Sequence, residues 1–166
     1  LNGREIIRSL EGAKKELSKD KRFVLALGGA RARHSMYEQF REIGGIPSSV
    51  ISETAVTGRN AELSEGLNVM AFAAIYDSAK VGRGVLVNSH ASVHHDSTVG
   101  SFAEISPGAR VLGRAQIGEL TSIGSNAAVL PDVSVGRNCV VGAGAVVTQD
   151  VPDGETVVGV PAEPIR

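Results

Sequence analysis

An aliphatic residue recurs at every sixth position over most of the chain. From Leu63 to Val147 the series contains only leucine, isoleucine and valine, and it never loses its phase. A helix repeats every 3.6 residues, so this period would leave it without a continuous apolar face. The pattern instead predicts short strands separated by corners, which is a parallel β-helix. The members of the series are Leu63, Val69, Ile75, Val81, Val87, Val93, Val99, Ile105, Val111, Ile117, Ile123, Val129, Val135, Val141 and Val147.

A second residue of each repeat is expected to point into the same interior. From Ala79 onward a mostly small residue stands two positions before each aliphatic one, and residues two apart on a strand share a face. Turn-forming segments such as Gly82–Gly84 follow the aliphatic residue. Cys139 takes one of the small inward positions, so we expect a buried thiol. With three sides to a coil, residues 63–147 would form about five coils.

The first 47 residues follow a different pattern and predict a partial α/β segment. A short helix is expected after Ser9, then a strand over Arg22–Leu27, a turn at Gly28-Gly29, and a helix from about Ala30 to Ile43. Strand, Gly-Gly and helix make up half of a nucleotide-binding βαβ arrangement. The turn either brings backbone close to a phosphate or sugar, or only joins strand to helix.

These patterns divide the chain into two expected domains. Residues 1–47 form the partial α/β, nucleotide-sugar-binding-like domain, and residues 48–166 form the β-helix with a C-terminal tail. We expect residues 52–60 to be out of phase with the repeat, and the α/β segment to cover the first coil. A last strand is expected at Thr156-Val157-Val158. The chain starts in the middle of an α/β unit, so residues upstream of Leu1 are expected.

Composition narrows the class of partner. The 166 residues include 20 glycines, no tryptophan and only 4% aromatic residues, which suits thin layers of small and branched side chains. A net charge of −1 gives no basic excess for nucleic acid. No signal peptide or membrane-spanning segment is visible, so a cytoplasmic location without membrane insertion is expected.

One corner of the repeat carries candidate chemistry. His94-His95-Asp96 follows Val93, and an imidazole beside a carboxylate can serve as a general base because the carboxylate favours the protonated ring. Two solvated histidines on a turn explain the same residues equally well.

A metal site is the alternative use of these histidines. His90 and His95 are five apart, as in the γ-class carbonic anhydrases, but the third histidine of that class is replaced here by Thr54 and Arg59. Zinc takes three or four ligands, so we expect no metal.

Two further segments complete a resemblance to a known family. The chain ends in Val158-Gly159-Val160-Pro161-Ala162-Glu163-Pro164, and its most telling stretch is Asn88–Gly100. Together with the repeat, they resemble the hexapeptide-repeat acyltransferases, which fold as left-handed β-helices. Within that family the chain is similar to sugar acetyltransferases typified by UDP-N-acetylbacillosamine N-acetyltransferase and the sialic acid O-acetyltransferases. The resemblance covers roughly residues 23–166.

The resemblance implies an activity and a set of site residues. It implies acetyl transfer from acetyl-CoA to an amine or hydroxyl of a nucleotide-linked sugar, in a homotrimer with acetyl-CoA between neighbouring prisms. His95 would be the general base and Asp96 its support, and Gly28 would touch the nucleotide sugar. The acetyl-CoA groove would be lined by Gly113, Ser125 and Ala143. Glu104 stands where the family has a coenzyme-binding histidine, and Glu163 where it prefers lysine or arginine. The competing functions are a γ-carbonic-anhydrase-like metal enzyme and a non-catalytic scaffold.

Overall fold

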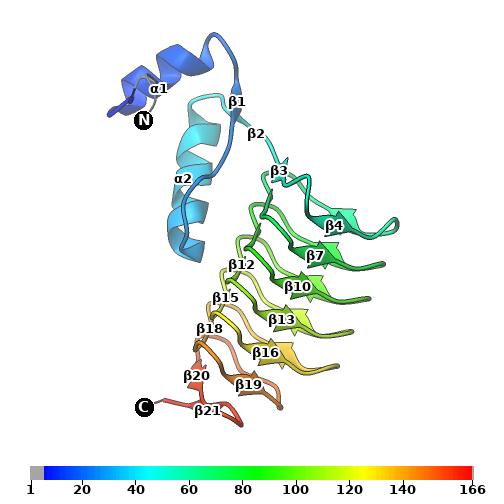
Figure 1. The fold of residues 1–166 in the computed structure, drawn as a ribbon. Coiled ribbons are helices and arrows are strands. Elements are labelled where there is room, and N and C mark those ends of the chain that lie inside the picture. The colour runs from blue at the N-terminus through cyan, green and yellow to red at the C-terminus, as the bar shows by residue number, and fades with distance from the viewer. Residues whose placement is uncertain (1–5, 166) are drawn as a thin grey trace.

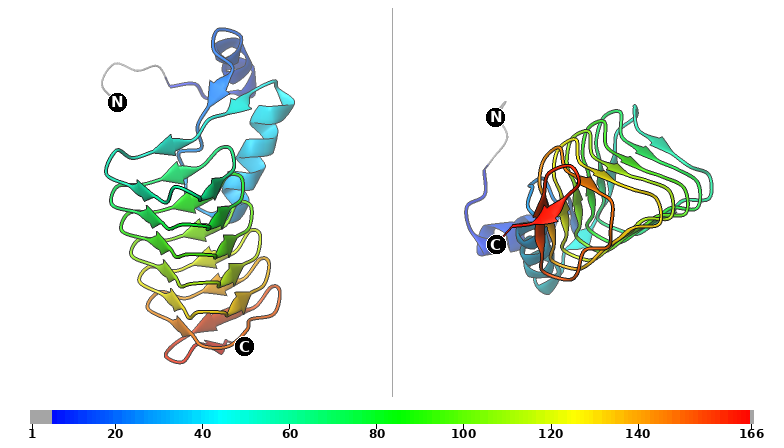
Figure 2. Two further views of the ribbon diagram at one scale, coloured as in Figure 1. Left: turned by 90° about the vertical axis from the view of Figure 1, so that its right-hand side faces the viewer. Right: turned by 90° about the horizontal axis from the view of Figure 1, so that it is seen from below.

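The computed structural model describes residues 6–165, which form a tall three-sided prism with two helices beside it (Figure 1). Three parallel sheets run the length of the prism, and each strand pairs with the strand one coil away. This arrangement confirms the parallel β-helix predicted from the six-residue period. Figure 2 shows the coils stacked one on another, from the side and from below.

We number the three faces of the prism by the order in which the chain first visits them. Face 1 contains β3 (Val50–Ile51), β6 (Asn68–Val69), β9 (Leu86–Val87), β12 (Glu104–Ile105), β15 (Ser122–Ile123), β18 (Val140–Val141), β20 (Thr156–Val158) and β21 (Glu163–Pro164). Face 2 contains β4 (Val56–Thr57), β7 (Ala74–Ile75), β10 (Ser92–Val93), β13 (Arg110–Val111), β16 (Ala128–Val129) and β19 (Val146–Val147). Face 3 contains β5 (Glu62–Leu63), β8 (Lys80–Val81), β11 (Thr98–Val99), β14 (Gln116–Ile117) and β17 (Ser134–Val135). The corners between faces are called the 1–2, 2–3 and 3–1 edges.

The interior of the prism is built from the aliphatic series. Val99 pairs with Val81 on one side and Ile117 on the other, and each is at most 3% exposed. The few polar inward side chains are satisfied locally, since the Thr121 hydroxyl donates to the Gly136 carbonyl at 2.6 Å. Cys139 is buried as predicted, with its thiol 3.0 Å from the Pro152 carbonyl oxygen.

The prism begins earlier than the sequence suggested. Residues 52–60 were expected to be out of phase, but β3 and β4 already pair in register with β6 and β7. Thr57 occupies a position that is aliphatic in the other repeats, so a search for apolar residues at every sixth position misses this repeat. A threonine is tolerated there because the first coil has no coil above it, and Thr57 is exposed.

At the other end, the expected last strand is present. β20 pairs in parallel with β18, and the tail turns back so that β21 pairs antiparallel with β20. This return covers an edge that would otherwise present unpaired backbone groups.

The N-terminal segment contains α1 (Leu10–Leu17), β1 (Arg22–Phe23), α2 (Ala30–Glu42) and β2 (Ile46–Pro47). The Ser9 side chain caps α1 by accepting from the Gly12 N–H, as predicted. β1 and β2 pair in parallel around α2, but β1 is much shorter than the strand expected over residues 22–27, because its partner β2 has two residues before the chain enters the prism at β3. Within residues 6–165, this two-stranded unit is the extent of the α/β segment.

The segment lies along the side of the prism and leaves the first coil open, contrary to our expectation (Figures 1 and 2). Ile51 in the first coil is 43% exposed. The segment lies at the side because α2 docks there through its buried face, on which Tyr37 packs against Phe102 of the 3–1 edge. Neither described helix is long and apolar enough to cross a membrane.

Arg33 of α2 is fully buried between this segment and face 1. Its guanidinium makes five hydrogen bonds: two to the Gly84 carbonyl, one each to the Leu25 and Leu27 carbonyls, and one to the Asn68 amide oxygen. Burial lowers the pKa of Arg33, and attraction by Glu104 opposes that effect. Because a guanidinium has five N–H donors, every donor is used: three of the bonds reach Gly84 and Asn68 of the prism, and two hold the loop before α2.

Candidate active site

The predicted imidazole–carboxylate pair forms at the 2–3 edge. His95 Nδ1 lies 2.8 Å from Asp96 Oδ2, and both side chains are more than half exposed. Asp96 adopts a φ of 59°, the left-handed conformation that turns this corner. A carboxylate can only accept, so Nδ1 carries the proton in the neutral ring and Nε2 presents its lone pair. The pair therefore has the geometry of a general base.

Gly113 lies one coil below and directly under the His95 ring. A Cβ added at Gly113 would be 2.7 Å from both Cε1 and Nε2 of His95. Any side chain there would displace the imidazole. The structure thus brings together three of the predicted site residues, His95, Asp96 and Gly113.

The other histidines point elsewhere. His94 is half-buried with its ring centroid 4.8 Å from that of Tyr76, and burial, followed by repulsion from His95 and Arg110, lowers its pKa. His90 lies on the 1–2 edge, stacked on Phe72 at 5.1 Å. Residues 6–165 contain no group of three or more His, Cys, Asp or Glu side chains that could hold a metal ion.

Two more predicted residues lie on a different edge. Ser125 and Ala143 occupy equivalent corners of successive coils on the 1–2 edge, and the Gly144 N–H donates to the Ser125 carbonyl between them. Face 2 separates this edge from the 2–3 edge that carries His95 and Gly113. The residues expected around acetyl-CoA are therefore not brought together within one chain.

The remaining two predicted residues meet on face 1. Glu104 Oε2 accepts a hydrogen bond from the Gly29 N–H at 2.6 Å, and Oε1 lies 3.6 Å from where a Cβ on Gly28 would be. Gly29 is the N-cap of α2 with a φ of 86°, and it has no side chain to cap the helix. Glu104 places a carboxylate at this helix N-terminus from the prism and accepts the N–H of the N-cap residue itself.

Comparison with known proteins places these observations in a family. The family model described as bacterial transferase hexapeptide (six repeats) matches residues 114–149. The acetyltransferase domain of PglB from Neisseria gonorrhoeae, solved with acetyl coenzyme A, is 34% identical, with 99% of this chain and 80% of that chain covered and a TM-score of 0.92. PerB from Caulobacter crescentus, solved with CoA and GDP-perosamine, is 32% identical, with 93% and 75% covered and a TM-score of 0.89.

The chain belongs to the hexapeptide-repeat acyltransferases. WeeI from Acinetobacter baumannii is a further similar structure, with 29% identity, 99% and 80% coverage and a TM-score of 0.93. Sequence comparison with curated proteins finds no match. The similar structures place the chain with sugar acetyltransferases inside this hexapeptide-repeat family.

One ion pair near the site was not singled out by sequence. Arg114 donates two hydrogen bonds of 2.7 and 2.8 Å to Asp132; these bonds, then the charge of Asp132, and to a smaller extent the charge of Asp96, raise the pKa of Arg114. The available signal was spacing, since Asp96, Arg114 and Asp132 are equivalent corner residues of successive hexapeptide-repeat coils. Arg114 is thus already engaged at the edge that carries His95.

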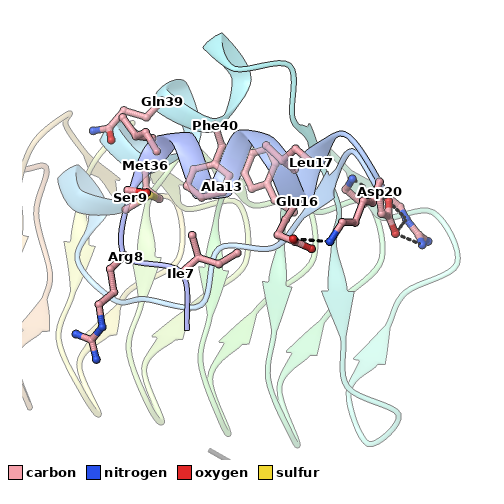
Figure 3. A pocket seen from close by; sticks show the side chains of 14 residues that line it. Ile7, Arg8, Ser9, Ala13, Glu16, Leu17, Asp20, Met36, Gln39 and Phe40 are labelled. Atoms are coloured by element: carbon pink, nitrogen blue, oxygen red, sulfur yellow. Dashed lines mark hydrogen bonds and ion pairs between the residues drawn. The ribbon is translucent and has the colours of Figure 1, made fainter. Parts of the chain in front are cut away.

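Two cavities flank the N-terminal segment, each of about 560 Å³. The first lies between α1, β1 and α2, is lined largely by apolar side chains such as Leu17, Met36 and Phe40, and contains none of the predicted site residues (Figure 3). The second lies between residues 24–28 and the outer side of face 1, where Gly28 and Asn88 are part of its lining.

Proposed function

We propose that this chain transfers an acetyl group from acetyl-CoA to an amine or hydroxyl of a nucleotide-linked sugar, with His95 as general base. The observation that carries the proposal is the His95–Asp96 pair, whose open Nε2 lies over Gly113 at an exposed edge. The kinship with PglB and PerB supports acetyl-CoA as the donor. An amine is the favoured acceptor because one similar structure is named as a perosamine N-acetyltransferase.

The chemistry follows from the hydrogen bonding of the pair. His95 Nε2 takes the proton from the acceptor as its nitrogen or oxygen attacks the thioester carbonyl. The tetrahedral intermediate then collapses, the carbon–sulfur bond breaks, and the coenzyme A thiolate leaves and takes up a proton. Asp96 holds the Nδ1–H and stabilises the imidazolium formed between these steps. The Gly113 N–H is our candidate donor to the developing oxyanion.

A homotrimer would unite the separated residues. Face 2 has His95 and Gly113 on one side and Ser125 and Ala143 on the other. Its outward strand positions are mostly small or apolar, namely Val56, Ala74, Ser92, Arg110, Ala128 and Val146. If three copies turn face 2 toward a common axis, the 2–3 edge of one chain meets the 1–2 edge of the next. Acetyl-CoA would then lie in the groove between these edges.

The N-terminal segment is our proposed site for the nucleotide sugar. We divide the chain at residue 47, with residues 1–47 as part of a Rossmann-like nucleotide-sugar-binding domain and residues 48–166 as the acyltransferase domain. The cavity lined by Gly28 and Asn88 supports this assignment, because Gly28 is the predicted substrate-binding residue. We also propose that the enzyme acts in the cytoplasm.

Replacement of the base tests the proposed function. We expect His95→Ala to lower kcat by about 10²–10⁴-fold with acetyl-CoA and UDP- or GDP-linked amino sugars, while the melting temperature stays unchanged. His34→Gln, at a half-buried histidine on α2 outside the candidate site, is the matched control and should keep wild-type activity.

Other results would identify the rival functions. A His95→Ala variant with full activity would remove the proposed base. Stoichiometric zinc or iron, with activity lost to chelators, would favour a carbonic-anhydrase-like enzyme. A protein that gains no thermal stability from coenzyme A would favour a scaffold, because a ligand at a hundred times its Kd adds about 2.7 kcal/mol.

A further inference from the structure

The turn before α2 is a place where a substrate phosphate would be expected to bind. Gly28 and Gly29 carry no side chains, α2 is 13 residues long, and its first turn contains no acidic residue. Backbone N–H groups and the helix dipole at such a position favour an anion. A nucleotide-linked sugar, the class of acceptor in the proposed function, brings two phosphates.

That position is already filled by an anion from the protein itself. Glu104 reaches across from face 1, and its Oε2 accepts the Gly29 N–H at 2.6 Å. The residues are 75 positions apart, so the contact is created by the docking of α2 on the prism. The side chain is half-buried between the turn and the prism. A phosphate at this turn would have to displace a carboxylate and then remain beside it.

The cavity lined by Gly28 offers a phosphate no compensating cation, whereas Arg31 lines a separate hollow beside Gly29. Arg33 is the only cationic residue among those found to line the Gly28 cavity, and all five of its N–H donors are used by protein acceptors. The Asn88 amide oxygen accepts from the Ser89 N–H, and the Asn68 amide oxygen accepts from Arg33. The remaining lining is mainly aliphatic, including Leu25 and Leu86.

Glu104 instead presents a hydrogen-bond acceptor to this space. Within the described residues no hydrogen bond is found for Oε1, the oxygen nearer to Gly28. An oxygen of this kind binds hydroxyl or ammonium groups, which donate hydrogen bonds, and repels phosphate.

We propose that Glu104 is a specificity-determining residue that excludes phosphate from the Gly28-Gly29 turn, so that the acceptor meets this turn through sugar hydroxyl or amino groups. The inference rests on the proposed function and refines its acceptor. Any diphosphate of the acceptor is then held away from the α2 N-terminus.

Inorganic pyrophosphate is the direct probe, titrated calorimetrically into the full chain. Glu104→Ala removes the carboxylate and opens the Gly29 N–H, so pyrophosphate should bind about tenfold or more tightly than to the wild type. Glu104→Gln keeps an acceptor for the Gly29 N–H but removes the charge, and should give a smaller gain. Glu119→Ala, which removes an exposed carboxylate on the 3–1 edge, is the matched control and should match the wild type.

The pyrophosphate titrations can overturn the role proposed for Glu104. Equal pyrophosphate binding by the wild type and both Glu104 variants, or equal absence of binding, overturns the proposal. If Glu104→Ala does not fold, Glu104→Gln alone decides by whether it binds pyrophosphate more tightly than the wild type. Acetyl-CoA titrated into the same samples tests the proposed function separately. Failure of the wild type to bind acetyl-CoA would contradict acetyl transfer, and the pyrophosphate affinities of the wild type and the Glu104 variants could still be compared.

Discussion

The 2–3 edge and face 1 use the same scaffold in opposite ways. At the edge, Asp96 binds an imidazole that no other element of the chain covers. On the face, Glu104 binds the backbone of α2 beneath a docked segment held by a buried Arg33. Asp96 stands at a corner and Glu104 on a strand of the same prism, and the role of each carboxylate depends on what the rest of the molecule brings to it. The bare 2–3 edge should therefore control catalysis, and on the covered face 1 the Arg33 contacts that dock α2 should control stability.

The largest expected effect is on the covered face. Arg33→Ala would leave the carbonyls of Gly84, Leu25 and Leu27 buried without their donors, and each such loss costs roughly 1–3 kcal/mol. We expect the free energy of unfolding to fall by about 3 kcal/mol or more in chemical denaturation. Arg31→Ala, at an exposed site on the same helix, should change it by less than about 0.5 kcal/mol. Equal effects of the two variants would show that Arg33 does not secure the docking.

At the bare edge the effect should appear in catalysis alone. In Gly113→Ala the new methyl group would push the His95 ring aside, and the exposed ring is free to move. A displacement of about 1 Å can cost about 10²-fold in rate. We expect kcat to fall by about that factor while the melting temperature stays within the error of the measurement. A Gly113→Ala variant that loses stability and keeps its kcat would show that the 2–3 edge serves the fold and not catalysis.

The smallest expected effect concerns pH. The pKa of His94 is lowered by burial first and then by His95 and Arg110, so the unfolded chain binds a proton at His94 more readily than the folded chain. Its contribution to stability is therefore present above the unfolded pKa of about 6.5 and is lost as pH falls through the folded pKa. Urea unfolding at pH 7.5 and 5.5 should show a smaller loss on acidification for His94→Gln than for the wild type. An identical loss would show that His94 does not contribute.

Much of this fold could be predicted from the six-residue period of aliphatic residues in the sequence. Because a coil contains eighteen residues over most of the prism, the positions of His95 and Gly113 on one edge, and of Ser125 and Ala143 on another, follow from counting. Thr57 shows the limit of that method, because a polar residue at an exposed first coil hides a repeat that the backbone still follows.

The N-terminal contacts could not be predicted in this way. The hydrogen bond from the Gly29 N–H to Glu104 joins residues 75 positions apart, and those from Arg33 to the Gly84 carbonyl join residues 51 apart, outside the period of the prism. They depend on how α2 docks, which the helix pattern alone does not determine. The buried positions Ala30, Arg33 and Tyr37 do share one side of the helix, so spacing could have indicated which side faces inward.

We propose that each active site joins the 2–3 edge of one chain to the 1–2 edge of the next, and mixed trimers test this arrangement most directly. His95→Ala disables the first edge and Ala143→Trp blocks the second, so each variant alone should be inactive. When the two are unfolded together and reassembled in equal amounts, random association gives about a quarter of the sites two intact edges, and about that share of wild-type activity should return. A mixture that stays inactive, although both variants form trimers, would show that the two edges do not share an active site.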